Sequence, residues 1–364
     1  MKRLRGWLVN GLVLVAAVVV GLAVVELGLR TFHPQPMGVW HQDRDGLGLH
    51  WPGLVSYLPQ HRLTVSFNSA GMRDVEHSVE KAPGVFRVLV LGDSFIEALQ
   101  VPFEESFTSL LQRELAGRTL GPVEVINASV SGWGTDDELK YLTSYGRRFR
   151  PDLIIVAMTL YNDISDNLRE RFHTVRDGTL VESTATRASF LEYKIIELKG
   201  FLASRLQTYQ LLIRARRARE TRAEAQRLST HVSSLFVHPD QRMSRGLELT
   251  RLLLERIRVV ASEDVGRVGL VLIPLGVQLS DRQFAEFVGA TQGSQIDRPQ
   301  RELRRIGERA GIEVIDLLPG FREWAASGGA ALYLSRDGHW DRPGHRLAAR
   351  IVASELVRVG LGRR

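Results

Sequence analysis

The stretch that decides the fold is VFRVLVLGDS, residues 85–94. Its first seven residues form a continuous apolar run with a single charge at Arg87, and such a run is typical of a strand that is buried on both faces. Gly92-Asp93-Ser94 then allows a tight turn, and a helical pattern follows from Glu104 to Leu115. The stretch therefore predicts a strand, a turn and a helix in direct succession.

The same alternation recurs along the chain. Four further apolar runs, separated mostly by helical patterns, are predicted as strands: Val123–Ile126, Leu153–Thr159, Val268–Ile273 and Ile312–Ile315. Strands that alternate with helices form a parallel sheet covered on both faces. With right-handed crossovers, the prediction is an α/β fold built on a three-layer, doubly wound, five-stranded parallel sheet of the flavodoxin-like kind. A functional site is then expected beyond the carboxyl ends of the strands.

Length and composition limit the classes of function. The chain has 364 residues, 44% apolar and 24% charged, which fits one large folded domain with additional segments and excludes extended disorder. Lys and Arg (48) outnumber Asp and Glu (41), and much of the excess lies near the N-terminus and between Arg205 and Arg251. Because the imbalance is local, no nucleic-acid partner is expected. The chain contains no cysteine, which excludes thiolate nucleophiles, cysteine zinc sites and disulfides.

The N-terminus carries a candidate membrane anchor. The run Trp7–Val25 is apolar except for Asn10, and as a helix it spans roughly 28 Å, close to the thickness of a bilayer core. Basic residues precede the run, which predicts a cytoplasmic N-terminus and an extracytoplasmic remainder. We expect residues 1–30 to be an uncleaved single-pass anchor. A cleaved signal peptide and a buried soluble helix are the alternatives, although no good cleavage site follows the run.

Two segments lie outside the predicted sheet. Residues 31–84, rich in Pro, Gly, His and Asp, read as an extracytoplasmic stalk and lead-in with one strand near Arg62–Phe67. The main folded domain is expected at 85–364, with a helical insertion at about 165–245 that includes a charged helical pattern from Phe190 to Leu228. Its arginines suit acidic glycan, lipid headgroups or a protein partner, or simply form a solvated helix face.

Polar groups follow three of the predicted strands and recur near the C-terminus. Ser94 begins a helix after the first strand, Gly132 lies in a small-residue loop after the second, Asn162 follows the third, and Asp337 with His339 stands near the end of the chain. Each alone is typical of a cap, a turn or a structural histidine. Together they supply a hydroxyl, a base, an acid to orient the base, and donors for an oxyanion, which are the groups that ester cleavage requires.

These blocks resemble those of the SGNH hydrolases, the GDSL esterase/lipase superfamily. The match covers Gly92-Asp93-Ser94, Gly132, Asn162, and Asp337 with His339, in family order over residues 85 to 350, and Phe67–Arg73 resembles a segment of membrane-anchored members. The resemblance implies Ser94 as nucleophile, His339 as base and Asp337 as its orienting acid. It also implies an oxyanion hole formed by Ser94, Gly132 and Asn162, with no cofactor and no metal.

Two departures from the family pattern affect these expectations. Leu160 occupies a position that is usually glycine, which predicts a reshaped loop or a narrower channel. The final block is Asp-x-His instead of Asp-x-x-His; if the loop is extended, Asp337 and His339 face the same side and still meet. Asp341 is the alternative orienting acid. Because residue 96 is Ile, the serine does not lie in the Gly-x-Ser-x-Gly elbow of the α/β-hydrolases.

Three functions follow from this interpretation. The first is a serine ester hydrolase that acts on an acyl or acetyl ester of cell-envelope glycan or lipid. The second, favoured by an Asp-x-His-Trp sequence that resembles SGNH-like alginate acetylation proteins, is an acyltransferase that modifies an exported polysaccharide with a membrane acyl-donor partner. The third is a non-catalytic envelope scaffold that retains the fold.

Overall fold

The computed structural model describes residues 2–118, 121–183, 188–217, 231–263, 266–289, 293–335 and 337–360. At its centre is a parallel sheet in the order β11-β10-β7-β5-β6. The strands are β5 (Phe86–Gly92), β6 (Val123–Ser129), β7 (Leu153–Thr159), β10 (Arg267–Ile273) and β11 (Glu313–Asp316). Numbered along the chain, the order is that of the flavodoxin-like doubly wound sheet, so the predicted fold class is confirmed.

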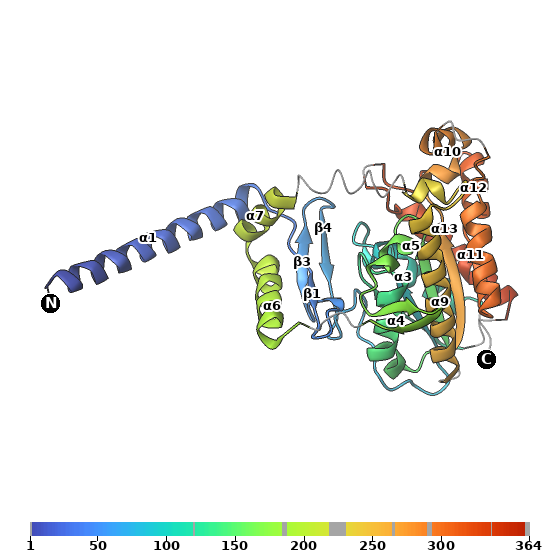
Figure 1. Cartoon of the computed structure of the whole chain (residues 1–364), viewed down its shortest axis with the longest axis horizontal. Coiled ribbons are helices and arrows are strands. Elements are labelled where there is room, and N and C mark those ends of the chain that lie inside the picture. The colour runs from blue at the N-terminus through green and yellow to red at the C-terminus, as the bar shows by residue number, and fades with distance from the viewer. Residues whose placement is uncertain are drawn as a thin grey trace.

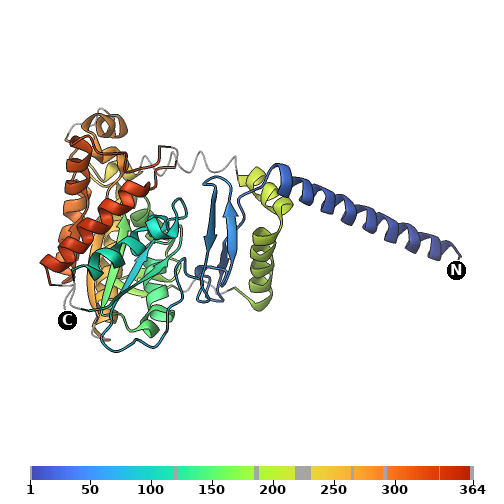
Figure 2. The same cartoon turned by 180° about the vertical axis from the view of Figure 1, so that it is seen from behind.

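Helices cover both faces of the sheet (Figures 1 and 2). One face packs on α4 (Thr135–Ser144), α9 (Gln241–Glu263) and α11 (Arg298–Arg309), and the other on α3 (Phe107–Ala116), α12 (Leu318–Ala326) and α13 (Arg342–Arg358). The alternation along β5 produces these two cores, because Leu89 and Leu91 enter the first while Val88 and Val90 enter the second. The pattern that predicted the strand thus also divides the hydrophobic core.

Short helical elements connect these layers. They are α2 (Ser94–Glu97), η1 (Phe103–Glu105), η2 (Gly146–Phe149), α5 (Asp163–Asp166), η3 (Asn167–Arg169), η4 (Gly276–Leu279) and α10 (Asp281–Val288). The helix predicted from Glu104 is divided, because Ser106 caps α3 by accepting the N–H of Ser109 at 3.5 Å. The strand order reverses at β5, and ligand sites of such sheets lie at this switch point. The α2 and α5 elements stand there, directly after β5 and β7.

The segment expected as a stalk and lead-in is folded. Its strands form two antiparallel pairs, β1 (Trp40–Gln42) with β2 (Gly48–His50) and β3 (Val55–Leu58) with β4 (Leu63–Ser66). Leu54, Leu58, Val65 and Phe67 enclose a small core of their own together with Leu99, which follows α2. This core joins the segment to the loop that follows α2.

Arg73, the last residue of the segment Phe67–Arg73, is buried and joins the lead-in to the end of α2 through hydrogen bonds. Its guanidinium donates to the carbonyl of Glu97 at 2.8 Å, to that of Val101 at 2.5 Å and to that of Ala98. Burial lowers the pKa of Arg73 to about 10, although the nearby Glu97 carboxylate favours the charged form. The side chain thus satisfies backbone acceptors where α2 ends, in the left-handed residue Ala98.

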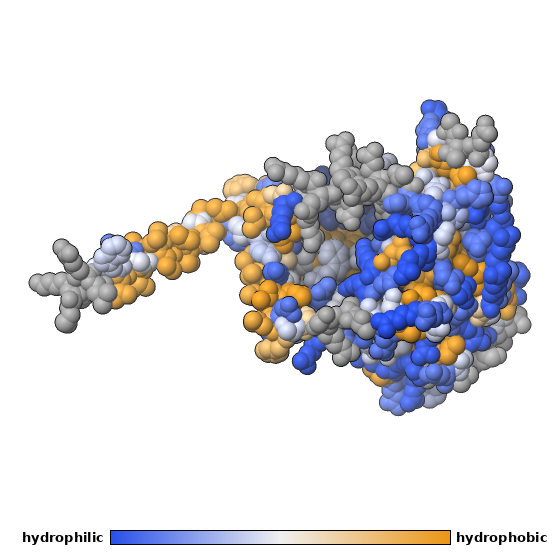
Figure 3. Space-filling view, viewed as in Figure 1, coloured by the Kyte–Doolittle hydropathy of each residue, from blue (hydrophilic) through white to orange (hydrophobic). Residues whose placement is uncertain are grey.

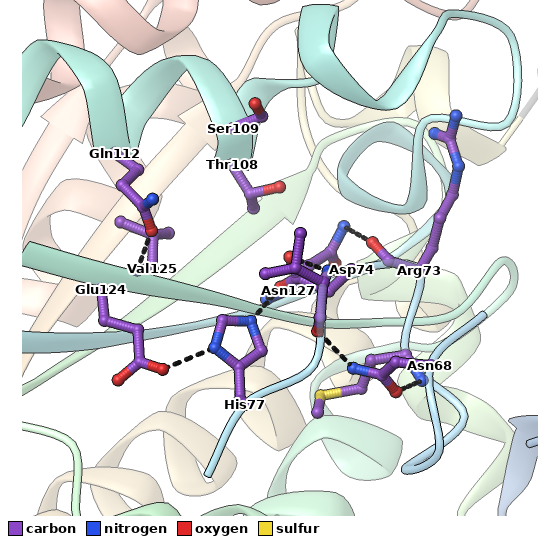
Figure 4. A network of polar contacts seen from close by, with 12 residues as sticks. Asn68, Arg73, Asp74, His77, Thr108, Ser109, Gln112, Glu124, Val125 and Asn127 are labelled. Carbon is purple, nitrogen blue, oxygen red and sulfur yellow. Dashed lines mark hydrogen bonds and ion pairs between the residues drawn. The ribbon is translucent and has the colours of Figure 1, made fainter. Parts of the chain in front are cut away.

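The same segment is attached to β6. Asp74 accepts the backbone N–H of Asn127 at 2.7 Å, and His77 lies between Asp74 at 3.0 Å and Glu124 at 2.6 Å (Figure 4). These carboxylates raise the pKa of His77 against the lowering effect of burial. The lead-in is therefore bonded to both strand β6 and the helix that carries Ser94.

The N-terminal helix and part of the insertion form the end of the molecule away from the parallel sheet (Figure 1). Helix α1 (Lys2–Phe32) contains a segment, Gly6–Phe32, that is long and apolar enough to cross a membrane, with a mean hydropathy of 2.8. The insertion contains the hairpin of β8 (His173–Arg176) and β9 (Thr179–Glu182) and the helices α6 (Phe190–Arg205) and α7 (Gln207–Arg217). Figures 1 and 2 show α6 and α7 beside the end of α1.

The helix predicted from Phe190 to Leu228 is broken at Leu206, so a single continuous helix is wrong. Leu206 is extended, with φ −114° and ψ 119°. Glu26 of α1 accepts the backbone N–H groups of Gln207 and Thr208, each at 2.9 Å, and so caps a new helix start. Residues 218–228 of the predicted helix lie outside the described residues.

Candidate active site

The five residues predicted from the sequence line one cleft at the carboxyl ends of β5 and β7. The cleft has a volume of about 1150 Å³, and its lining includes Ser94, Gly132, Asn162, Asp337 and His339. These residues come from four separate places in the chain, since Asp337 and His339 share one loop. The doubly wound sheet brings them together because β5, β6 and β7 end at the same edge.

Ser94 is the first residue of α2. The preceding residue, Asp93, caps the helix by accepting the N–H of Phe95 at 3.0 Å and also accepts the hydroxyl of Thr159 at 3.1 Å. Complete burial raises the pKa of Asp93 to about 6, although these hydrogen bonds favour its charged form. The backbone N–H of Ser94 lies in the first turn and has no intrahelical acceptor, which makes it available to an anion.

His339 contacts Ser94 directly. Its Nε2 lies 2.7 Å from the Ser94 hydroxyl oxygen, the separation needed for proton transfer. The next residue, Trp340, is fully buried and packs against the ring of Phe95 at a centroid distance of 5.3 Å. The carbonyl of His339 also accepts the N–H of Leu334 at 2.7 Å. Core packing on one side and a backbone bond on the other hold the imidazole at the serine.

Asp337 reaches His339 through a turn, so the extended loop expected from the sequence is wrong. Gly338 lies in the left-handed region at φ 76°, and Asp337 accepts the backbone N–H of His339 at 3.1 Å. The other carboxylate oxygen lies 3.6 Å from Nδ1 of His339, which is longer than a hydrogen bond. Burial raises the pKa of Asp337, but the contacts with His339 and the nearby His61 lower it by more. The pKa of Asp337 is therefore below its ordinary value.

Asp341, the alternative orienting acid, has a different task. It is the N-cap of α13, and its carboxylate accepts the backbone N–H of Arg342 at 2.8 Å. Within the part of the chain that the structure describes, no contact joins Asp341 to the imidazole. Of the two acids, Asp337 is therefore the one that contacts His339.

Gly132 lies in an open turn that lines the same cleft as Ser94. Its φ of 81° favours glycine, and a Cβ built at this position meets no described atom within 4 Å. Arg169 donates to the Gly132 carbonyl at 2.9 Å. The neighbouring Trp133 side chain donates to the carbonyl of Gly48 at 2.9 Å. The loop is thus open toward substrate and fixed at its back.

Glu97 is a site residue that the sequence analysis missed. It is completely buried at the end of α2 and accepts the backbone N–H of Ser131 at 2.8 Å, together with the Ser131 hydroxyl. From the lead-in, Nε2 of His50 lies 2.6 Å away and the indole N–H of Trp40 donates at 3.2 Å. Burial raises the pKa of Glu97, but His50 and Ser131 lower it by more, so the pKa is below its ordinary value. The signal in the sequence was a lone carboxylate in the apolar stretch FIEAL, residues 95–99.

Asn162 lines the cleft, but its amide is engaged. Its Nδ2 donates to Asp166 at 3.0 Å and to Asp163 at 3.3 Å. Leu160 does not narrow the channel as expected, because its side chain is buried in the core and does not line the cleft. The exposed Tyr161 lines the cleft in its place.

The cleft is asymmetric in polarity. Many of its polar groups gather around Ser94, while the far wall, built from η4, α10, α12 and the loop before His339, is mostly apolar but includes Gln283 and Glu286 of α10. The apolar members of that wall are Leu275, Val277, Leu279, Phe287, Trp324, Leu332, Tyr333 and Leu334. A ligand with a polar reacting group and an apolar substituent matches this distribution.

A second cavity, of about 670 Å³, meets the opposite side of the Gly132 loop. It extends between that loop, strand β1 and the helices α6 and α7, and it carries the cationic side chains of Arg171, Lys199 and Arg216. Gly132 lines both cavities. The two spaces therefore share one short backbone segment.

Three buried carboxyl groups lie near Ser94. Asp93, Glu138 and Asp163 are each at most 1% exposed. Both carboxyl oxygens of Glu138 lack a hydrogen-bond partner among the described residues. Burial, together with the proximity of Asp93, raises the pKa of Glu138 and of Asp163 well above their ordinary values. No group of three or more His, Asp or Glu side chains in the described ranges is arranged to hold a metal ion.

Comparisons with known proteins identify similar folds. No protein-family model matches the chain, and no curated protein matches it. It is similar to the solved structure of LAE5, an alpha/beta hydrolase from the metagenome of Lake Arreo, Spain, with 14% identity and a TM-score of 0.43 over 79% of this chain and 99% of that one. It is also similar to a catalytic mutant of Axe2, an acetylxylan esterase from Geobacillus stearothermophilus, with 13% identity and a TM-score of 0.42 over 77% and 96% of the two chains. A lipase/acylhydrolase from Enterococcus faecalis has 16% identity and a TM-score of 0.38 over 74% and 94%.

The buried Glu138 predicts a pH-dependent effect of substitution on stability. Between pH 4.5 and its raised pKa, Glu138 is ionised in the unfolded chain and protonated in the folded one. The parent therefore loses up to about 1.4 kcal/mol of stability per pH unit as pH rises through this window. Glu138→Gln removes this pH-dependent loss of stability. The free energy of unfolding of the variant, relative to that of the parent, should therefore increase from pH 5 upward. Urea unfolding of the full-length protein in detergent, followed by tryptophan fluorescence, measures this difference.

Leu142→Ala, on the same helix, is the matched control. It removes a buried side chain without changing a titratable group, so its difference from the parent should be the same at every pH. A Glu138→Gln difference that is equally constant would contradict the assignment.

Proposed function

We propose that the chain is a serine ester hydrolase of the SGNH type. The observation that carries the proposal is the 2.7 Å contact between Nε2 of His339 and the hydroxyl of Ser94. This contact lies at the switch point of a doubly wound sheet and opens onto a cleft with an apolar wall. A hydroxyl paired with an imidazole at a helix start is the arrangement of an activated nucleophile.

The reaction uses groups of the protein alone. His339 accepts the Ser94 proton through Nε2 while the serine oxygen attacks the ester carbonyl carbon. The resulting oxyanion receives hydrogen bonds from the N–H groups of Ser94 and Gly132. When the intermediate collapses, the alcohol leaves with the proton from His339. Water, activated by the same imidazole, then releases the acid and restores Ser94.

Two side chains complete the site when substrate binds. Asp337 stabilises the cationic imidazole, and the 3.6 Å separation from Nδ1 closes as positive charge develops on the ring. The Asn162 amide becomes the third oxyanion donor by turning from Asp166 toward the cleft. In this way the substrate itself completes the polar half of the site.

The substrate is an acyl ester at the cell envelope. The apolar wall of the cleft favours an acyl group with a hydrocarbon portion, and its polar side accommodates the alcohol part of a glycan or lipid. Basic residues before the apolar run of α1 favour a cytoplasmic N-terminus, which puts the catalytic domain outside the cytoplasm. The substrate is then an ester of the envelope near the outer surface of the membrane.

An acyltransferase is the second candidate, and the second cavity favours it. That cavity reaches the Gly132 loop from the anchor side and carries three cationic side chains. An acidic glycan held there would bring an acceptor hydroxyl to the acyl-enzyme in place of water. The residues of the first half-reaction would be the same.

The first prediction of this proposal concerns Ser94. A fluorophosphonate probe should label the full-length protein, and Ser94→Ala should abolish both labelling and the hydrolysis of p-nitrophenyl esters from acetyl to long-chain. The neighbouring Ser131→Ala, in contrast, should retain labelling. If the parent protein is folded by circular dichroism but is not labelled, the hydrolase proposal is wrong and a non-catalytic scaffold takes its place.

A second prediction separates the two acids. Asp337→Asn should slow ester turnover by up to about 10⁴-fold, because the wrong imidazole tautomer is favoured. Asp341→Asn should leave the rate nearly unchanged and affect only the start of α13. Steady-state rates, with circular dichroism as the folding control, test both. The reverse pattern would assign the orienting role to Asp341.

A third prediction distinguishes hydrolysis from transfer. With an activated acetyl ester as donor, acetate release should proceed without added polysaccharide, and Ser94→Ala should release none. The measurement follows acetate and glycan acetylation together, with and without envelope polysaccharide. Negligible acetate release alone, with Ser94-dependent acetylation of added glycan, would establish the transferase.

A further inference from the structure

Helix α6 has an exposed apolar face. Five of its large apolar side chains are between 43% and 68% exposed: Phe190, Leu191, Ile195, Leu198 and Phe201. At 3.6 residues per turn they fall within an arc of about 140°. In Figure 3 apolar residues cover α6 and the adjoining anchor, whereas most of the visible surface of the catalytic domain is polar. Such a continuous patch marks an interaction surface.

The opposite face of α6 is already occupied. Ala203 accepts the backbone N–H of Gly38 at 2.9 Å. At Gly200 an added Cβ would lie 3.4 Å from the ring of Trp51. The lead-in therefore holds the helix by one side, so the exposed apolar face points away from the protein.

The start of α7 extends this face. Leu211 and Leu212 are exposed, and Arg214 and Arg216 lie on either side of them by helical spacing. On α6, the exposed Lys199 lies at one border of the apolar arc, while the exposed Lys194 lies within the arc and pairs with Glu197 at 2.7 Å. Exposed apolar side chains with basic residues beside them fit a surface that lies in the headgroup layer of a membrane.

Contacts with α1 fix this face relative to the candidate anchor. Arg30 of α1 donates to the carbonyl of Arg205, the last residue of α6, at 2.6 Å. Glu26 of α1 caps the start of α7. In Figures 1 and 2 the axis of α6 runs across the direction of α1, on the side of the molecule from which α1 projects. A bilayer crossed by α1 therefore meets α6 along its length.

We propose that the apolar faces of α6 and α7 lie in the interfacial layer of the bilayer that α1 crosses. The occupant is lipid because the face is continuous with a helix that is itself apolar enough to span a membrane. The two helices thus form a foot that holds the catalytic domain against the membrane in one orientation.

Site-directed spin labelling tests the proposal on the full-length chain, which has no cysteine to remove. Single cysteines replace Leu198 on the apolar face, its neighbour Lys199 at the border, Arg282 on distant α10 and Val15 in α1. Each labelled protein is placed in lipid nanodiscs, and its collisions with oxygen and with a water-soluble nickel chelate are measured. Oxygen is concentrated in the bilayer and the chelate in water.

Labels at Leu198 and Val15 should favour oxygen over the chelate by several-fold relative to Arg282, with Lys199 intermediate. A Leu198 label as open to the chelate as Arg282 would overturn the proposal. Protection of Leu198 from both reagents would indicate a protein partner, and added spin-spin broadening would identify it as a second copy; either result also overturns it. A Val15 label that is accessible to the chelate would contradict both inferences, that α1 crosses the bilayer and that α6 and α7 lie in its interfacial layer.

These outcomes do not depend on catalysis. Circular dichroism confirms the fold of each variant. The spin-label results would stand if the Ser94 probe failed to react, and the probe results would stand if α6 proved to face water.

Discussion

The site depends on one buried negative charge, the carboxylate of Glu97. A carboxylate removed from water is stable only where hydrogen bonds and positive charge compensate its lost hydration. Here the compensation comes from three separate parts of the chain: the Ser131 backbone and hydroxyl, the His50 imidazole and the Trp40 indole. The requirement to satisfy one buried group therefore draws the lead-in, helix α2 and the Gly132 loop to one point.

This constraint changes the role of residues 31–84. They are bonded to the candidate site at two points, through Glu97 and through Arg73, which satisfies the carbonyl groups at the end of α2. The short helix α2 has little stability of its own. Its position, and with it that of Ser94, comes from the strands before it and the lead-in beneath it.

The sequence predicted the features that local patterns determine. The apolar runs identified the strands of the sheet, since a strand buried on both faces must be apolar throughout. The carboxyl ends of those strands placed Ser94, Gly132 and Asn162 in one cleft. Their proximity in the structure agrees with that placement, while their chemical roles stay predictions.

Features that depend on distant contacts were not predictable. The break at Leu206 requires Glu26, which lies far earlier in the chain, and the helical periodicity on either side contains no sign of it. The direction of the Leu160 side chain depends on the core beneath it. The turn at Gly338, by contrast, is a local feature. It was missed because the spacing of Asp337 and His339 alone does not distinguish an extended loop from a turn with a left-handed glycine. Glu97 was missed because its partners are separated from it by tens of residues.

The bonds of Glu26 and Arg30 to the insertion have a further consequence. A protein on a flexible tether samples a thick layer of solution, whereas one held at the root of its anchor has little freedom to rise or turn. With α1 in a bilayer, the cleft would keep a nearly constant height above the surface. The turnover rate would then follow the number of ester groups per unit area of membrane, and dilution of the surrounding solution would leave it unchanged.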